Sequence, residues 1–129
     1  MNLPWSEIIA RYERVSLHSA AMQGMLTLAR YVELSPLASG LSVTTSMFDL
    51  CIAQAPTEDV CGGPYLRISP NLERQIEFRF IDTFVTADQW HRIVEPDQAI
   101  PRLLKFLDQL RWFSPEALRT WPPGSEATS

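Results

Sequence analysis

The sequence is poor in cysteine and has no long apolar run. Its two cysteines, Cys51 and Cys61, are too few for a disulfide scaffold. No stretch reaches the roughly 18 apolar residues of a membrane helix. The start, MNLPWSEIIARYER, also lacks the basic segment and apolar stretch of a signal peptide. These absences predict a cytoplasmic protein that makes no membrane contact and keeps both thiols reduced.

Basic residues are also scarce and are not grouped. The net charge is −4 at pH 7, the pI is near 5.1, and Lys105 is the single lysine beside ten arginines. These residues are spread along the chain from Arg11 to Arg119. A general nucleic-acid binder needs a clustered basic face. The composition therefore argues against nucleic acid as a partner.

The motifs of the common catalytic and cofactor sites are missing. Cys51 and Cys61 are ten residues apart and His18 and His91 are 73 apart, which matches no zinc-ligand spacing. Pro64 follows the glycine pair 62–63, where a phosphate-binding loop needs further glycines and a lysine that lead into a helix. We expect no metal, no cofactor and no ordinary enzyme. A reactive Cys51 acting with His91 remains the catalytic alternative.

The chain length and composition are those of one globular domain. With 129 residues and 46% apolar residues, the chain can bury a sizeable core. We place the domain at residues 1–120 and expect a flexible tail at 121–129, where WPPGSEATS has no apolar periodicity.

Helical periodicity is found at both ends of the chain. Apolar residues recur at three- and four-residue steps from Pro4 to Leu34. This stretch is either one helix or two, since Ser19 could cap a second helix and Gly24 weakens a single long one. A second apolar stripe, from Ile100 to Leu110, predicts a C-terminal helix.

Between the helices, apolar and polar residues alternate as in strands. We predict a strand over 42–54, with its firmest part at 47–54, and further strands at 65–69 and 74–82. The segment 87–95 is either a fourth strand or a helix. The connections are too short for parallel crossovers, so the sheet is antiparallel. The predicted fold is an α+β two-layer sandwich of order α(α)-β-β-β-β-α. Its three or four strands are covered on one face by the N-terminal and C-terminal helices.

The alternation divides the predicted sheet into two faces. The apolar face, expected to form the core, collects Phe48, Leu50, Ile52, Leu66, Ile68, Ile76, Phe78 and Phe80. The other face collects Asp49, Cys51, Tyr65, Arg67, Glu77 and Arg79. Cross-strand ion pairs on a solvated surface would explain these charges. Tyrosine and arginine are also enriched where proteins bind one another.

A second candidate site is the sequence QWHR at 89–92. Trp90, His91 and Arg92 offer stacking, proton exchange and anion binding, but neighbouring residues of a strand point to opposite faces. The binding candidates are thus Asp49, Tyr65, Arg67, Glu77, Arg79, Trp90 and His91.

From these candidates we predict a small binding or regulatory module that contacts another protein through the polar sheet face. Two alternatives remain open. One is a small-molecule-binding protein or minor enzyme that uses the same face with His91 and Cys51. The other is a structural homodimer.

Overall fold

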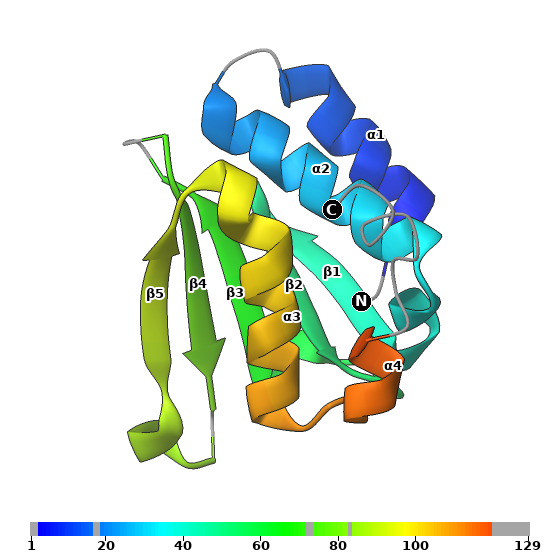
Figure 1. The fold of residues 1–129 in the computed structure, drawn as a ribbon, viewed down its shortest axis with the longest axis vertical. Helices are drawn as coiled ribbons and strands as arrows, with labels where there is room; N and C mark the ends of the chain where they lie inside the picture. The colour runs from blue at the N-terminus through cyan, green and yellow to red at the C-terminus, as the bar shows by residue number, and fades with distance from the viewer. Residues whose placement is uncertain (1–2, 17–18, 72–73, 83, 120–129) are drawn as a thin grey trace.

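The computed structural model describes residues 3–16, 19–71, 74–82 and 84–119. Two helices come first, five strands follow, and two further helices end the described chain (Figure 1). The helices are α1 (Trp5–Val15), α2 (Ala20–Leu34), α3 (Ala99–Leu110) and α4 (Pro115–Arg119). The strands are β1 (Leu41–Ser46), β2 (Asp49–Gln54), β3 (Tyr65–Pro70), β4 (Ile76–Ile81) and β5 (Trp90–Val94). Short 3₁₀ helices occupy Pro36–Gly40 (η2), Val60–Gly62 (η3), Thr86–Asp88 (η4) and Pro96–Gln98 (η5).

The strands of the described residues form one antiparallel sheet in the order β1-β2-β3-β4-β5. Each strand pairs with its neighbours in the chain, as expected for strands joined by short connections. The predicted α+β class with an antiparallel sheet is confirmed. The predicted number of three or four strands is wrong, because the sheet has five.

The additional strand arises from a hairpin that the sequence conceals. The sequence predicts one strand over 42–54, whereas β1 and β2 are separate strands joined by Met47 and Phe48. Met47 has a φ of 56° and is 90% exposed, and Phe48 is 43% exposed. Phe48 therefore belongs to a turn and not to the predicted core. The Tyr12 hydroxyl donates a hydrogen bond of 2.9 Å to the Phe48 carbonyl and ties the turn to α1.

Two alternatives left open by the sequence are decided by the structure. The N-terminal stretch is two helices, and the Ser19 hydroxyl caps α2 by accepting a hydrogen bond from the Met22 amide. The segment 87–95 contains strand β5, which pairs with β4. Pro96 comes two residues after this strand and begins η5, which leads into α3.

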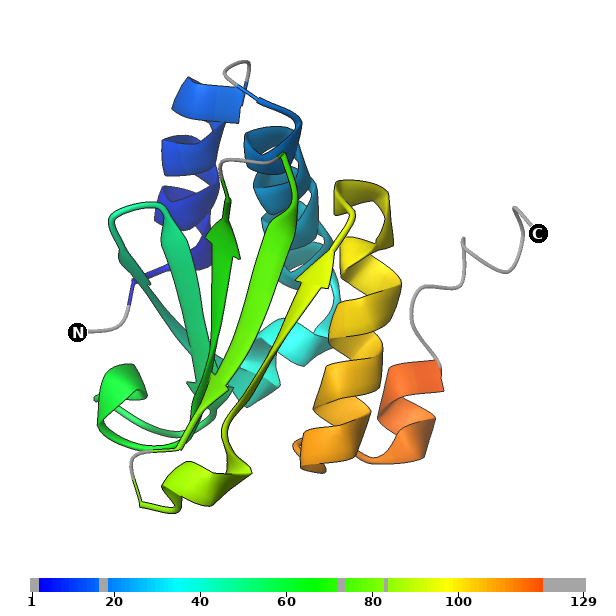
Figure 2. The same ribbon diagram turned by 90° about the vertical axis from the view of Figure 1, so that its left-hand side faces the viewer.

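One face of the sheet forms the main core with the helices (Figure 2). Alternate residues of β2, β3 and β4 are buried on this face, as the apolar periodicity requires. Phe78 of β4 is fully buried, and its ring centroid lies 5.0 Å from that of Phe106 on α3. Helix α2 comes so close to the sheet at Gly24 that a methyl group there would lie 2.8 Å from Ile76 Cδ1.

A second, smaller cluster lies on the opposite face, which we call the outer face. It joins Cys51, Ala53 and Tyr65 of the sheet to Val60, and Ile81 packs beside them. Val60 belongs to η3, and Figure 2 shows η3 on the side of the sheet away from α3. One part of the outer face is therefore covered by the chain itself.

The predicted tail at 121–129 lies outside the described residues, and the predicted single domain at 1–120 stays a prediction. None of the described helices combines the length and the apolar character needed to cross a membrane.

Candidate functional site on the outer sheet face

The strand register brings four of the predicted site residues onto the open part of the outer face. Arg67 pairs with Arg79, and Arg79 pairs with His91, so one row of side chains crosses β3, β4 and β5. Glu77 lies two residues before Arg79 and points to the same face. Side chains that are 12 residues apart in the chain, Arg67 and Arg79 and then Arg79 and His91, are thus direct cross-strand neighbours.

Asp49 connects these charges. Its carboxylate accepts a hydrogen bond of 2.7 Å from Arg67 Nε and lies 3.7 Å from Arg79 Nη2. Arg79 also lies 4.0 Å from the Glu77 carboxylate and donates a 3.4 Å hydrogen bond to the Ser69 hydroxyl. The side chains of Asp49 and Arg67 are mostly buried, whereas the Arg79 side chain is 40% exposed. The network therefore fixes the orientation of both arginine side chains on the outer face.

The environment of Arg67 keeps this residue charged. Partial burial alone would lower the pKa of its guanidinium, but hydrogen bonds to Asp49 and Tyr65 and the nearby negative groups raise the pKa above its ordinary value. Arg79 differs, because its Nε is buried without a hydrogen-bond partner among the described residues. Because this atom is buried, the part of Arg79 that is open to further contacts is the exposed remainder of its side chain.

An open hollow of about 390 Å³ adjoins Arg79. It is lined from β4 by Glu77, Arg79, Phe80 and Ile81, and from β5 and the residue before it by Gln89, Trp90 and His91. Ile93 follows His91 on the same face, pairs with Glu77 and is 45% exposed. The hollow thus combines two acid–base side chains, a guanidinium and exposed apolar surface.

Two other predicted site residues have their rings packed elsewhere, although Trp90 also lines the hollow. Tyr65 faces outward but is buried in the small cluster under Val60, and this burial raises the pKa of its hydroxyl. Trp90 lies on the helix side, where its ring centroid is 5.9 Å from that of Phe80 and 4.8 Å from that of Phe106. The side chains of Trp90 and His91 therefore point to opposite faces of the sheet, as the strand periodicity predicts.

Cys51 is poorly suited to nucleophilic catalysis. It is fully buried, and burial raises the pKa of its thiol to about 12, so the thiol is protonated at neutral pH. His91 lies three strands away, a separation of about 14 Å at about 4.8 Å per strand. The Asp82 carboxylate, after β4, accepts hydrogen bonds from the amides of Phe84 and Val85 and so caps the loop that follows. No Cys–His pair forms between these residues.

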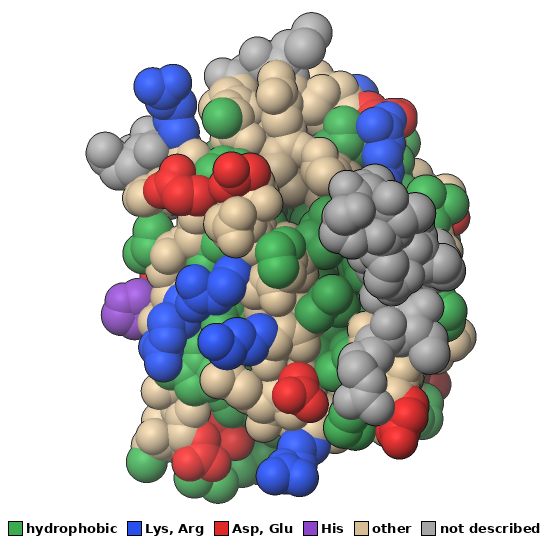
Figure 3. Space-filling view, in the orientation of Figure 1, with side chains coloured by type: hydrophobic (Ala, Val, Ile, Leu, Met, Phe, Trp, Pro, Cys, Tyr) green, Lys and Arg blue, Asp and Glu red, His purple; other side chains and the backbone are tan. Residues whose placement is uncertain are grey.

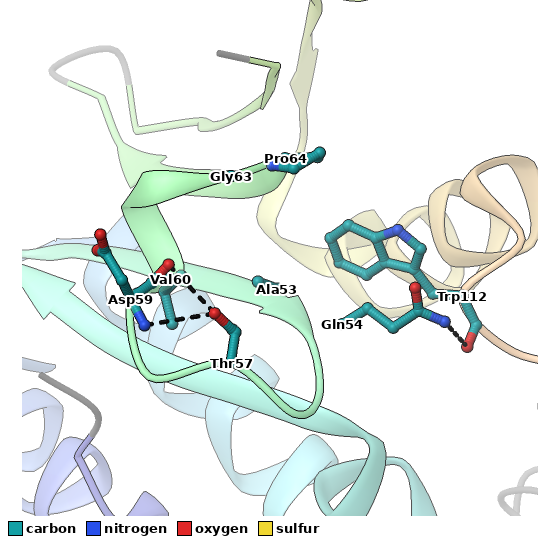
Figure 4. Close-up of a pocket in the computed structure, with 8 residues that line it drawn as sticks. All are labelled: Ala53, Gln54, Thr57, Asp59, Val60, Gly63, Pro64 and Trp112. Atoms are coloured by element: carbon teal, nitrogen blue, oxygen red, sulfur yellow. Dashed lines mark hydrogen bonds between the residues drawn. The ribbon is translucent and has the colours of Figure 1, made fainter. Parts of the chain in front are cut away.

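A second cavity, of about 190 Å³, lies at the end of β2 (Figure 4). Its walls are the loop from Thr57 to Pro64 and the indole of Trp112, which face one another across the opening. Asp59 is its single ionisable lining residue, and the Thr57 hydroxyl bonds to the Asp59 backbone. This lining offers neither a nucleophile nor a pair of acid–base groups. Among the described residues, no group of three or more His, Cys, Asp or Glu side chains is placed to hold a metal ion.

Sequence reasoning missed Ser69 and Ile93 as members of the outer face. The sequence could have identified Ser69, because it lies two residues after Arg67 on β3 and so points to the same face. The sequence could also have identified Ile93, because it lies two residues after His91. That step requires 90–94 to be a strand beside β4.

The chain matches no family model, no curated protein and no solved structure.

Proposed function

We propose that this chain is a small binding module that docks another protein on the open part of its outer sheet face. The observation that carries the proposal is the arrangement around Arg79. A partly exposed guanidinium, held by Asp49 and Glu77, lines an open hollow, and exposed Ile93 follows His91 on the same face. Arginines with apolar surface around them are the typical centres of protein interfaces.

The shape of the hollow supports a protein partner over an enclosed small molecule. Ligand pockets bury most of a small ligand and are lined mainly by apolar groups. This hollow is open and has charged walls in Glu77, Arg79 and His91. A protein side chain can enter it while its own backbone stays outside, and a carboxylate would find both Arg79 and His91 in reach.

A small anionic ligand is the second candidate, because the volume of about 390 Å³ is within the size range of ligand sites. Such a ligand would use Arg79 and His91 as cationic or hydrogen-bonding groups. Catalysis with Cys51 is not part of this candidate, since the thiol is buried and lies two strands from the β4 wall of the hollow, about 10 Å away at about 4.8 Å per strand.

Affinity capture with the intact tagged protein tests the proposal. Arg79→Glu reverses the charge beside the hollow, and we expect it to reduce recovery of a specific partner about tenfold, equal to about 1.4 kcal/mol. Arg14→Glu makes the same charge change at an exposed position on α1 and should leave recovery unchanged.

A stability control accompanies the capture. Arg79→Ala should change the free energy of unfolding by less than about 1 kcal/mol, because partly exposed ion pairs contribute little. The proposal fails if Arg79→Glu and Arg14→Glu recover the same proteins in the same amounts.

A further inference from the structure

The two edge strands of the sheet, β1 and β5, differ in whether another backbone segment covers them. At the β1 edge, the Leu3 amide donates a hydrogen bond of 2.9 Å to the Val43 carbonyl, so the N-terminal segment covers part of that strand. The β5 edge has no such backbone cover among the described residues. There the His91 carbonyl accepts a hydrogen bond of 2.7 Å from Arg92 Nη1. The Arg92 side chain therefore bonds back to the backbone of its own strand.

Three cationic side chains lie along this edge on the helix side, and we call them the basic ridge. They are Arg92 of β5 and Arg102 and Lys105 of α3. Figure 3 shows Lys and Arg side chains gathered between the positions of β5 and α3, with a histidine at the nearby margin. None of the three belongs to an ion pair within the described residues. A chain with a net charge of −4 therefore presents a local excess of positive charge.

The basic ridge rests on a rigid aromatic base. The Arg92 guanidinium lies 5.4 Å from the centroid of the Trp90 ring, and the Arg102 guanidinium lies 5.2 Å from that of Phe106. The rings of Trp90 and Phe106 are themselves 4.8 Å apart. Cation–π contacts of this kind fix the positions of guanidiniums without neutralising their charge.

We propose that the β5 edge binds an acidic, extended segment of another protein as an added strand. An exposed edge offers unpaired backbone groups to a peptide, and main-chain hydrogen bonds supply affinity in this binding mode. Side chains of the added strand that point to the helix side would meet the basic ridge. Alternate acidic residues would therefore match its charge.

Two other occupants fit less well. A second copy of β5 would bring Arg92 and its neighbouring cations against the same cations, and like charges across a strand pair are destabilising. A single-stranded nucleic acid needs free aromatic faces for its bases. Trp90 already packs against Phe80, Phe106 and Arg92. The ridge uses residues outside the proposed outer-face site, so this inference stands even if that proposal fails.

The test measures fluorescence anisotropy of a labelled seven-residue peptide that alternates threonine and glutamate. With the purified intact protein we expect saturable binding below about 1 mM, equivalent to about −4 kcal/mol. The same peptide with lysine for glutamate should not saturate in that range. A version with N-methylated backbone nitrogens should also lose binding, because it cannot donate to the strand edge.

Matched variants locate the site. Arg92→Glu should weaken binding of the acidic peptide about tenfold, whereas Arg14→Glu, with the same charge change on α1, and the outer-face variant Arg79→Ala should not. The proposal is overturned if the acidic and lysine peptides bind alike, if N-methylation has no effect, or if Arg92→Glu binds as well as Arg14→Glu. Tighter binding of an oligothymidylate than of the acidic peptide would also overturn it, in favour of nucleic acid.

Discussion

Phe78→Ala is expected to lower the free energy of unfolding by about 3–5 kcal/mol, the range for truncating a fully buried phenylalanine. Phe78 has no exposed surface, and its ring packs against Phe106 of α3. The truncation removes the contact between the centre of the sheet and the C-terminal helix, and it leaves a cavity that the neighbouring strands can fill only in part. Chemical denaturation followed by tryptophan fluorescence and far-UV circular dichroism measures the change.

Phe84→Ala is the matched control for this truncation. Phe84 lies in the loop before η4 and is 77% exposed, so the same chemical change should cost less than about 0.5 kcal/mol. Equal losses for Phe78→Ala and Phe84→Ala would mean that the faces of β4 are assigned wrongly.

Gly24→Ala is expected to destabilise the protein by about 1–3 kcal/mol, the cost of adding a methyl group to a packed core. In an ordinary helix interior the same change is favourable by about 1 kcal/mol, since glycine is a poor helix former. Here the new Cβ would lie 2.8 Å from Ile76 Cδ1 and 2.9 Å from Pro96 Cβ. The isoleucine methyl can rotate away, but the proline ring cannot, so α2 or η5 must move.

The control for Gly24→Ala is Gln23→Ala, one residue earlier on the exposed side of α2. It should be neutral or slightly stabilising, and both variants can be compared by thermal and denaturant unfolding. If Gly24→Ala stabilises the protein, the close approach of α2 to the β4–η5 region is not present in solution.

The parts of the fold that the sequence predicted are those with clear periodicity. The alternation in β4 correctly placed Ile76, Phe78 and Phe80 in the core, and the Ser19 cap correctly separates α1 from α2. The β1–β2 hairpin was missed because its turn residues, Met47 and Phe48, carry none of the usual turn chemistry. Their apolar side chains continued the alternation, so two strands looked like one.

The candidate site was predicted only in part for a different reason. Alternation assigns a residue to a face, but register decides which residues of that face are neighbours. The sequence therefore grouped Arg67 with Arg79, yet it treated His91 as a separate candidate. It also could not show that η3 covers Tyr65 and Cys51, because a covering loop has no periodic signal.

The main competing account of the outer face is that its charges only neutralise one another. The Asp49–Arg67 pair fits that account, since both side chains are largely buried and joined by a 2.7 Å hydrogen bond. Arg79 does not, because its 40% exposed side chain is held at longer distances and stands next to a hollow and to exposed Ile93. The proposed function therefore rests on Arg79 and its neighbours on β4 and β5.

Site-specific photo-crosslinking tests this claim most directly. The photoreactive residue p-benzoylphenylalanine would replace Ile93 on the outer face or, as a control, Leu34, which is 70% exposed at the end of α2. In cells of the source organism we expect one discrete adduct from position 93 that disappears with Arg79→Glu, and no such adduct from position 34. The absence of a discrete adduct at position 93, or an adduct that Arg79→Glu leaves unchanged, would contradict the account.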